Sequence, residues 1–123
     1  MPDADLEAQR EVVDAFLAAA RDGDFERLVA LLHPDVVIRA DLGPAGSREV
    51  RGAAAVAGQA LAYERVGLVI KPALINGAMG LVATRDGQPF SVGGFTIRRG
   101  RVVEMDWLAD AARIRELDLT ILD

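Results

Sequence analysis

A series of apolar runs in the second half of the chain constrains its fold more than any other feature. Four such runs follow one another: 66–75, 79–84, 90–97 and 102–108. The turn residues between them are Asn76-Gly77, Asp86-Gly87 and Arg99-Gly100. Asn-Gly and Asp-Gly pairs favour tight hairpins because both residues tolerate positive φ. The second half therefore predicts an antiparallel meander, with Gly93-Gly94 marking a bulge or sharp bend in its third strand.

The first half of the chain has the spacing of helices. Apolar residues recur at helical intervals over 6–20, and Gly23 is a natural stop for this first helix. A short second helix is expected over 25–32, where His33-Pro34 ends it because the residue before proline avoids the α region. A third helix, rich in alanine, is expected over about 52–63.

Helices followed by a meander indicate an α+β domain. A strand expected over 36–42 would join the sheet, and Asp110 would cap a last short helix. In such a domain a curved antiparallel sheet wraps the helices and can leave a cavity between the two layers. The 123 residues fit one domain, 1–123, and the cavity is where we expect its function to lie.

Composition excludes several classes of function. The chain has no cysteine and one histidine, which excludes thiolate sites and argues against a zinc cluster. No glycine cluster precedes a helix as a phosphate-binding loop does, so no nucleotide site is implied. Neither a metal nor a cofactor is expected. The net charge is −5, and acidic residues dominate 3–26, which disfavours direct binding to nucleic acid. Without a membrane-length apolar run or a signal-peptide pattern, the expected location is the cytosol.

Arg39, Asp41 and His33 are the first candidates for acid–base chemistry. Arg39 and Asp41 lie two residues apart on the predicted strand, so they share a face at about 6.6 Å. An arginine that fixes a proton-accepting carboxylate is a workable catalytic device, but the pair also fits a surface ion pair. His33 titrates near neutrality and fits a general base near the cavity mouth, or a side chain that meets the last helix carbonyls.

Asp106 is a further candidate because it lies in an otherwise apolar strand. Glu104 and Asp106 share one face of that strand, whereas Val103, Met105 and Trp107 share the other. If Asp106 faces the cavity, burial would make it a proton carrier. If Trp107 faces the cavity instead, Asp106 is solvated or paired at an interface. Periodicity alone does not say which face is concave.

The remaining candidates concern ligand binding. Tyr63 and Gln59 are candidate polar groups of the cavity. Four large side chains are core residues by default and line or plug the cavity only as a second role: Met79, Phe95, Met105 and Trp107.

Several segments taken together resemble a known family. The stretch 12–25, followed by Leu31-Leu32-His33-Pro34-Asp35-Val36-Val37, resembles the opening of a SnoaL-like domain of the nuclear-transport-factor-2-like superfamily. Other segments resemble the C-terminal extension of extracytoplasmic-function sigma factors of the sigma-J type: Arg39-Ala40-Asp41, Val50-Arg51-Gly52-Ala53, Pro72-Ala73-Leu74-Ile75-Asn76-Gly77, Gly93-Gly94-Phe95-Thr96, Val103-Glu104-Met105-Asp106 and 117–123.

The resemblance implies a cone in which three N-terminal helices pack on a curved antiparallel sheet, often as a dimer. In these sigma factors the extension is a built-in regulator that contacts the promoter-recognising domains. The chain departs from the family at two segments. Asp41-Leu42-Gly43-Pro44 stands where the family often has Asp-Gly-Gly-Gly-Lys, and 109–114 stands where it often has Asn-Pro-Asp-Lys-Leu.

The resemblance thus implies a regulatory, small-molecule-binding domain of a sigma factor. It would bind an apolar molecule, form a homodimer through the outer face of the meander, and contact the sigma-factor core domains if it belongs to a longer chain. The alternative is a free-standing isomerase, epoxide hydrolase or cyclase that uses Asp41, Asp106, Arg39, Tyr63 and His33. A third alternative is a dimerisation module with a filled core. An enzyme needs two ionisable groups in an open pocket, whereas a regulator needs only a pocket or a partner surface.

Overall fold

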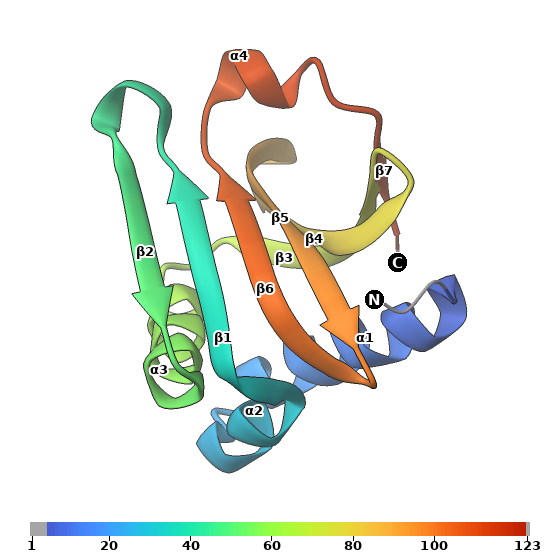
Figure 1. Cartoon of the computed structure of the whole chain (residues 1–123). Helices are drawn as coiled ribbons and strands as arrows, with labels where there is room; N and C mark the ends of the chain where they lie inside the picture. Colours follow the sequence, from blue (N-terminus) through green and yellow to red (C-terminus); the bar gives the residue numbers. More distant parts are fainter. Residues whose placement is uncertain (1–4, 123) are drawn as a thin grey trace.

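A seven-stranded sheet curls around three helices in the computed structural model, which describes residues 5–122 (Figure 1). The helices on the inner side are α1 (Leu6–Arg21), α2 (Phe25–Leu31) and α3 (Ala53–Glu64). The strands are β1 (Leu32–Asp41), β2 (Ser47–Arg51), β3 (Val69–Ile75), β4 (Ala78–Arg85), β5 (Gln88–Arg98), β6 (Arg101–Leu108) and β7 (Leu119–Ile121). A 3-10 turn, η1 (Gly43–Ala45), and a short helix, α4 (Ala111–Ile114), complete the chain. The predicted α+β cone, with three N-terminal helices on a curved sheet, is confirmed.

The strands lie in the order β2-β1-β6-β5-β4-β3-β7. All neighbouring pairs are antiparallel except β1 and β6, which run parallel with Ile38 opposite Met105 and Ala40 opposite Trp107. This one parallel pair differs from the expected antiparallel sheet. The hairpin with β5 fixes the direction of β6, and β1 pairs with the remaining edge of β6. The alternation of apolar residues in β1 indicates a strand, but it does not indicate whether that strand runs parallel or antiparallel to its neighbour.

Capping residues set the ends of the first two helices. The Asp5 side chain accepts a hydrogen bond from the Glu7 N–H at 2.9 Å, and Asp24 accepts one from the Arg27 N–H at 3.1 Å. Gly23, with φ of 67°, separates the two helices as predicted. The helix α2 ends at Leu31 and β1 begins at Leu32, so His33-Pro34 lies in the first part of a strand that starts earlier than expected.

Two short edge strands, β2 and β7, were not expected from the sequence. The strand β2 occupies a polar, mostly exposed segment, and it pairs with β1 from Val37–Arg51 to Asp41–Ser47. The strand β7 pairs with β3, where Ala73 lies opposite Ile121. Both strands lack an apolar alternation because they bury little surface. The expected last helix is present as α4, and Asp110 caps it by accepting from the Ala112 N–H.

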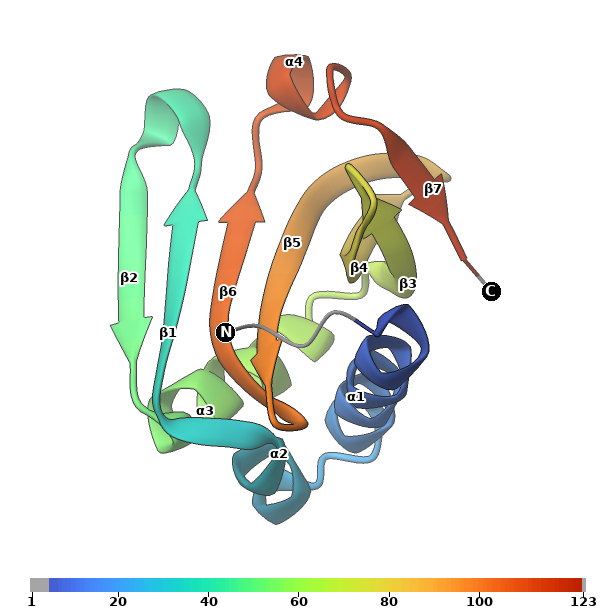
Figure 2. The same ribbon diagram turned by 45° about the vertical axis from the view of Figure 1, so that its right-hand side comes forward.

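Two glycines allow β4, β5 and β6 to pack closely where the sheet curves. Figure 2 shows β5 bending strongly along its length. A Cβ at Gly93 would lie 2.5 Å from the Trp107 ring, and one at Gly80 would lie 2.2 Å from the Gly93 carbonyl oxygen. The pairing runs regularly through Gly93-Gly94, so of the two alternatives expected there the bulge is wrong and a bend remains. The irregularities in pairing fall at Ala83/Thr84 and Thr96/Ile97.

The main core lies between the helices and the concave face of the sheet. Its fully buried side chains include Leu28, Leu32, Met79, Leu81 and Met105. The rings of Phe16 and Phe95 meet edge to face with centroids 5.4 Å apart. A smaller cluster lies on the outer side of the sheet, where α4 covers it: Ala73, Val82, Val92 and Ile114. Within residues 5–122, no helix is long and apolar enough to cross a membrane.

Candidate functional site

A cavity of about 290 Å³ lies between the helices and the concave face of the sheet. Apolar side chains from α1, β1, β2, α3, β3, β4 and β6 form most of its wall: Phe16, Leu17, Ala20, Ile38, Ala40, Leu42, Val50, Ala60, Ile70, Leu81 and Met105. This volume is at the lower end of the roughly 300–1,000 Å³ typical of small-molecule pockets. The expectation of a mostly apolar pocket in this position is confirmed.

Aromatic side chains are concentrated around the cavity. The chain has four phenylalanines, one tyrosine and one tryptophan, and four of these six residues line the cavity: Phe16, Tyr63, Phe90 and Trp107. The rings of Tyr63 and Trp107 lie 5.6 Å apart and are tilted by 46°. The Phe90 ring is partly exposed, and the Arg85 guanidinium lies 4.7 Å from its centroid. Large, flat aromatic rings thus enclose the space that is available to a ligand.

One hydrogen-bonded pair supplies the polar group in this apolar wall. The hydroxyl oxygens of Tyr63, on α3, and Ser91, on β5, lie 2.6 Å apart. Ser91 is buried, with 3% of its surface exposed. Tyr63, predicted as a polar cavity residue, is therefore part of the lining, together with a serine that the sequence analysis did not single out.

Charged groups at the cavity are few. Among the described residues that line it, Arg48 and Glu64 are the charged ones, and Gln59 is the remaining polar side chain. Arg48 and Gln59 are exposed and Glu64 is half-buried, which places Arg48 and Gln59 at the rim. Gln59 was predicted here, whereas Arg48 and Glu64 were not. Within residues 5–122, Glu64 is thus the one carboxylate of the lining.

The predicted acid–base residues of β1 and β6 lie on the other side of the sheet. Because Trp107 and Met105 face the cavity, Asp106 faces outward, and the alternation in β1 likewise turns Arg39 and Asp41 away. These three residues line a hollow on the outer face, next to Arg113 of α4. The expectation that Asp41 or Asp106 would lie at the cavity wall is therefore wrong, and the physical reason is the choice of concave face.

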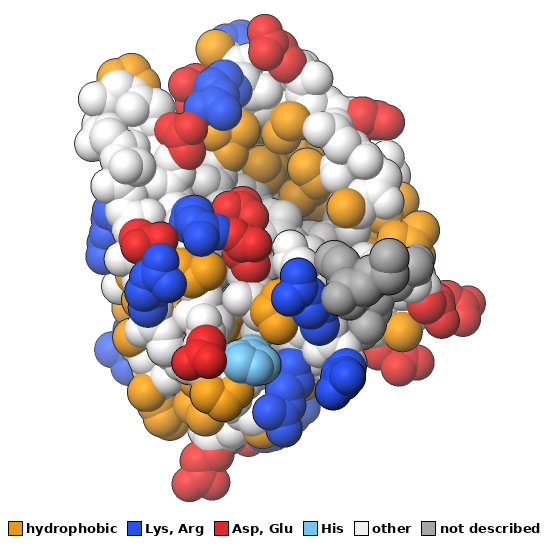
Figure 3. All heavy atoms as spheres, viewed as in Figure 1, with side chains coloured by type: hydrophobic (Ala, Val, Ile, Leu, Met, Phe, Trp, Pro, Cys, Tyr) orange, Lys and Arg blue, Asp and Glu red, His pale blue; other side chains and the backbone are white. Residues whose placement is uncertain are grey.

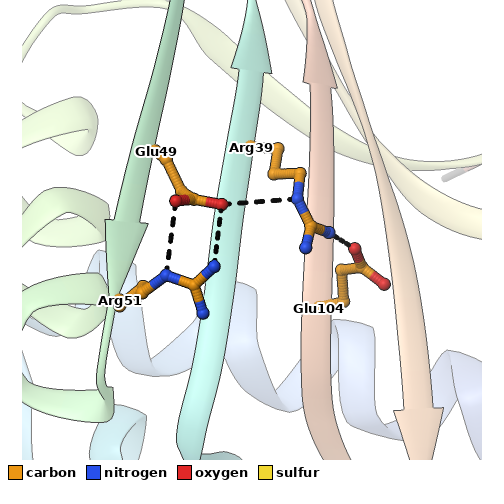
Figure 4. Close-up of polar contacts among 4 residues, drawn as sticks. All are labelled: Arg39, Glu49, Arg51 and Glu104. Carbon is orange, nitrogen blue, oxygen red and sulfur yellow. Dashed lines mark hydrogen bonds and ion pairs between the residues drawn. The ribbon is translucent and has the colours of Figure 1, made fainter.

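On the outer face Arg39 belongs to an exposed charged network with Glu49, Arg51 and Glu104, which Figure 4 shows. Glu49 lies between two arginines: its carboxylate accepts from Arg51 at 3.1 and 3.3 Å and lies 3.5 Å from Arg39. Arg39 also pairs with Glu104 of β6. Figure 3 shows these charged side chains grouped over β2, β1 and β6, beside an apolar hollow that extends toward α4 and β7. Arg39 is thus in surface ion pairs, but its partners are Glu49 and Glu104 rather than the expected Asp41, whose carboxylate pairs with Arg113.

Asp41 connects the end of β1 to α4. The Gly43 N–H donates to its carboxylate at 2.9 Å, and Arg113 forms an ion pair with the other carboxylate oxygen. The backbone hydrogen bond first, and the guanidinium second, lower the pKa of Asp41 below its ordinary value of 3.8. A carboxylate held in its charged form in this way is a structural tie rather than a proton carrier.

His33 and two of the predicted apolar residues also lie away from the cavity. The His33 ring is exposed at a corner of the outer face, and its Nδ1 accepts from the Asp35 N–H at 3.0 Å. This contact is local and does not involve the end of α2. Met79 and Phe95 are buried in the main core without lining the cavity. Met105 is buried in the core and also lines the cavity, whereas Trp107 lines the cavity and is partly buried against the core. Among residues 5–122, no group of three or more histidine or acidic side chains is placed to hold a metal ion.

Sequence signals for the missed residues were weak but present. Ser91 lies two residues from Gly93 and four from Phe95, so strand alternation places all three on the inner face. A polar residue at an inward position of a buried strand indicates a partner across the core. Glu64 and Arg48 gave no such signal, because each belongs to the end of an element whose orientation only the tertiary structure sets.

Comparison with known proteins shows relatives among solved structures. No protein-family model matches the chain, and no curated protein matches it. The extracytoplasmic-function sigma factor SigJ of Mycobacterium tuberculosis matches with a TM-score of 0.71 and 30% identity, over 88% of this chain and 44% of that protein. The chain therefore spans less than half the length of SigJ.

Two further solved structures match this chain over nearly all of their own length. An NTF2-like protein from Burkholderia xenovorans LB400 has a TM-score of 0.61 and 19% identity, over 93% of this chain and 98% of that one. A protein from Sinorhizobium meliloti, named as a polyketide cyclase, has a TM-score of 0.56 and 21% identity, over 79% and 93%. At these identities the likeness concerns the fold alone.

Proposed function

We propose that this chain, which has the SnoaL-like fold of the nuclear-transport-factor-2-like superfamily, is a regulatory domain of an extracytoplasmic-function sigma factor. The regulator works by binding a small apolar molecule in the cavity between its helices and its sheet. Occupancy of the cavity then changes how the domain contacts the promoter-recognising domains. The likeness to SigJ, over 88% of this chain, supports this assignment.

The composition of the cavity wall carries the proposal. The wall is apolar and aromatic, and among the residues that the structure describes Glu64 is its single carboxylate. The groups suited to acid–base chemistry, Arg39, Asp41 and Asp106, lie on the opposite face of the sheet. A binding site needs only complementary shape and a few polar contacts, whereas general acid–base catalysis needs ionisable groups within reach of the substrate.

The outer face offers a surface for the promoter-recognising domains. It carries the network of Arg39, Glu49, Arg51 and Glu104, and these side chains are largely exposed. The parallel pairing of β1 and β6 joins this network to the inner wall, because Ala40 and Trp107 of the same strands line the cavity. A ligand that moves Trp107 would therefore act on strands that carry partner-facing charges.

The enzyme alternative uses the same cavity with a different residue set. A substrate inside it would meet Glu64 and Tyr63 but none of Asp41, Asp106, Arg39 and His33. An isomerase, epoxide hydrolase or cyclase built here would thus depend on Glu64 as its general base. Turnover of an epoxide or enone by the purified chain, abolished by Glu64→Gln, would favour this alternative over the regulator.

The test of the regulator uses a cavity-filling variant. Ala60→Phe places a ring in the cavity, and Ala62→Phe places the same ring on the exposed side of the same helix as the matched control. A chimera in which this chain replaces the matching part of SigJ is then assayed for transcription from a SigJ promoter. We expect Ala60→Phe to change transcription and Ala62→Phe to leave it unchanged. Equal transcription from all three chimeras would contradict the proposal.

A further inference from the structure

We infer that the hydrogen-bonded pair of Tyr63 and Ser91 is the polar anchor of the cavity, and that the ligand is a compact ring compound with a carbonyl oxygen and no negative charge. This inference rests on the proposed ligand-binding function and adds the chemistry of the ligand. It does not depend on whether the bound molecule regulates a sigma factor or is transformed by an enzyme.

The pair joins two elements that are distant in sequence. Tyr63 lies in the last turn of α3 and Ser91 near the start of β5, and their oxygen atoms are 2.6 Å apart. Ser91 is one of two buried polar side chains among the described residues, and the other, Thr84, donates to the Val69 carbonyl. Burying a hydroxyl has a free-energy cost unless it forms hydrogen bonds, so Ser91 depends on Tyr63 for its partner.

Counting hydrogens shows what the pair offers to a ligand. Two hydroxyl groups carry two hydrogens, and their mutual contact uses one of them. The second hydrogen has no acceptor among the hydrogen bonds of the described side chains. Since both residues line the cavity, one O–H donor is available to whatever occupies it. A carbonyl oxygen fits this donor because it accepts a hydrogen bond and brings no further hydrogen that the apolar wall would leave unpaired.

The surroundings of the pair define the rest of the ligand. Trp107 lies beside Tyr63 at 5.6 Å, and Phe16 and Phe90 also line the cavity. Aromatic walls favour flat ring systems through offset or edge contacts. Arg48 is exposed at the rim and the other charged lining residue, Glu64, is acidic, so a negatively charged ligand group beside the Tyr63–Ser91 pair would be removed from water without an ionic partner.

Three related probes separate these features. 1-Tetralone has a flat bicyclic body with a ketone, tetralin has the same body without the oxygen, and tetralin-1-carboxylate carries a charge. Each is titrated into the chain by calorimetry. We expect the ketone to bind about fivefold more tightly than tetralin, which is the typical net effect of one hydrogen bond. The carboxylate should bind more weakly than either.

Variants assign the preference to the pair. Tyr63→Phe and Ser91→Ala each remove one hydroxyl, and Thr84→Val removes the other buried hydroxyl, which does not line the cavity. The ratio of ketone to tetralin affinity should fall to about one in Tyr63→Phe and decrease in Ser91→Ala. Thr84→Val should keep the wild-type ratio. Unchanged tetralin binding in every variant shows that the cavity remains folded.

The outcomes distinguish this inference from the proposed function. If tetralone and tetralin bind equally to the wild type, or if the preference survives Tyr63→Phe, the anchor is wrong and ligand binding by the cavity stands. If the carboxylate binds most tightly, the cavity favours a negatively charged ligand and the inference is overturned. If none of the three probes binds, both the anchor and the ligand-binding function are wrong.

Discussion

Gly80 and Gly93 show how single residues control the close packing of the sheet around the cavity. A methyl group at Gly80 would meet the Gly93 carbonyl oxygen, which is backbone, whereas one at Gly93 would meet the Trp107 ring, which is a side chain. Backbone atoms in a paired sheet have less freedom to shift than a side chain that borders a cavity. Adding a methyl group should therefore destabilise the fold more at Gly80 than at Gly93.

We predict that Gly80→Ala lowers the free energy of unfolding by at least the roughly 1–3 kcal/mol typical of overpacking, and Gly93→Ala by less. In Gly93→Ala the Trp107 ring must move toward the cavity, so its fluorescence should change even though the fold is kept. Gly58→Ala is the matched control, because nothing lies within 4 Å of its Cβ and it is in helix α3. That variant should gain stability by about 0.5–1 kcal/mol. Urea titration measures all three, and an unaffected Gly80→Ala would contradict the packing argument.

The pair of Asp41 and Arg113 gives a prediction about pH. Because the folded protein lowers the pKa of Asp41, the carboxylate contributes stability above its ordinary pKa of 3.8. This contribution is lost as the pH falls through the folded-state pKa. Asp41→Asn should therefore melt at a lower temperature than the wild type at pH 7, and the two should converge at the acidic end of a series from pH 7 to pH 2. A difference in melting temperature that is constant across the series would contradict the assignment.

For single residues, the sequence predicted several members of the cavity lining, but it did not predict which face of the sheet each side chain occupies. It singled out Tyr63, Gln59, Met105 and Trp107, which line the cavity, together with Asp41 and Asp106, which do not. Alternation in β6 placed Trp107 and Asp106 on opposite faces but contains nothing that says which face is concave. The curvature of the sheet decides this, and curvature depends on contacts between strands that are distant in sequence.

The elements divide into those with a strong local signal and those held by neighbours. Helical spacing and capping residues predicted α1 and α2, and turn residues predicted the hairpins at Asn76, Asp86 and Arg99, each with positive φ. The strands β2 and β7 had no apolar pattern to indicate them. They exist because an edge of β1 and an edge of β3 each offer unpaired backbone groups.

Asn76 holds β7 in place, which gives a prediction for this element. Its backbone N–H donates to the Asp118 carbonyl at 2.7 Å, and its side-chain oxygen accepts from the Asp118 N–H at 2.8 Å. Asn76→Gly keeps the positive φ of the turn but removes the side-chain acceptor, so we expect a loss of about 1 kcal/mol. Backbone amides of Asp118 and Thr120 should exchange faster with deuterium.

The control for β7 is the same change in the next hairpin. Asp86→Gly also replaces a residue with positive φ in a turn, and it is distant in sequence from β7. Exchange at Asp118 and Thr120 should stay at the wild-type rate in this variant. Equal acceleration in both variants would mean that the β7 edge responds to general loss of stability rather than to the Asn76 contact.

The whole molecule follows the general plan predicted from the order of elements. Helices first and a meander after them gave the cone, and the underfilled space beside an alanine-rich helix gave the cavity. The parallel pairing of β1 with β6 could not be predicted, because it joins segments more than 60 residues apart (Ile38 with Met105). That pairing joins β1 and β2 to the meander and so places β1 side chains on the cavity wall and on the outer face.

Self-association is the remaining prediction for the whole molecule. The outer face combines the Arg39, Glu49, Arg51 and Glu104 network with an apolar hollow toward α4 and β7, which Figure 3 shows. A face with charges of both signs can complement itself across a two-fold axis, and burying the apolar hollow adds a favourable free energy. We therefore expect the chain to form a homodimer at micromolar concentration in sedimentation velocity.

Leu108 is the residue with which to test this interface. Leu108 is the last residue of β6, packs against the cluster that α4 covers, and lines the hollow next to Arg113 on the outer face. Leu108→Asp should therefore convert the dimer to monomer. Phe25→Asp is the control, because Phe25 is an exposed apolar residue on α2, on the helical side of the sheet. It should leave the sedimentation coefficient unchanged. A wild-type protein that sediments only as a monomer, or a Phe25→Asp variant that dissociates as readily as Leu108→Asp, would rule out an interface on the outer face.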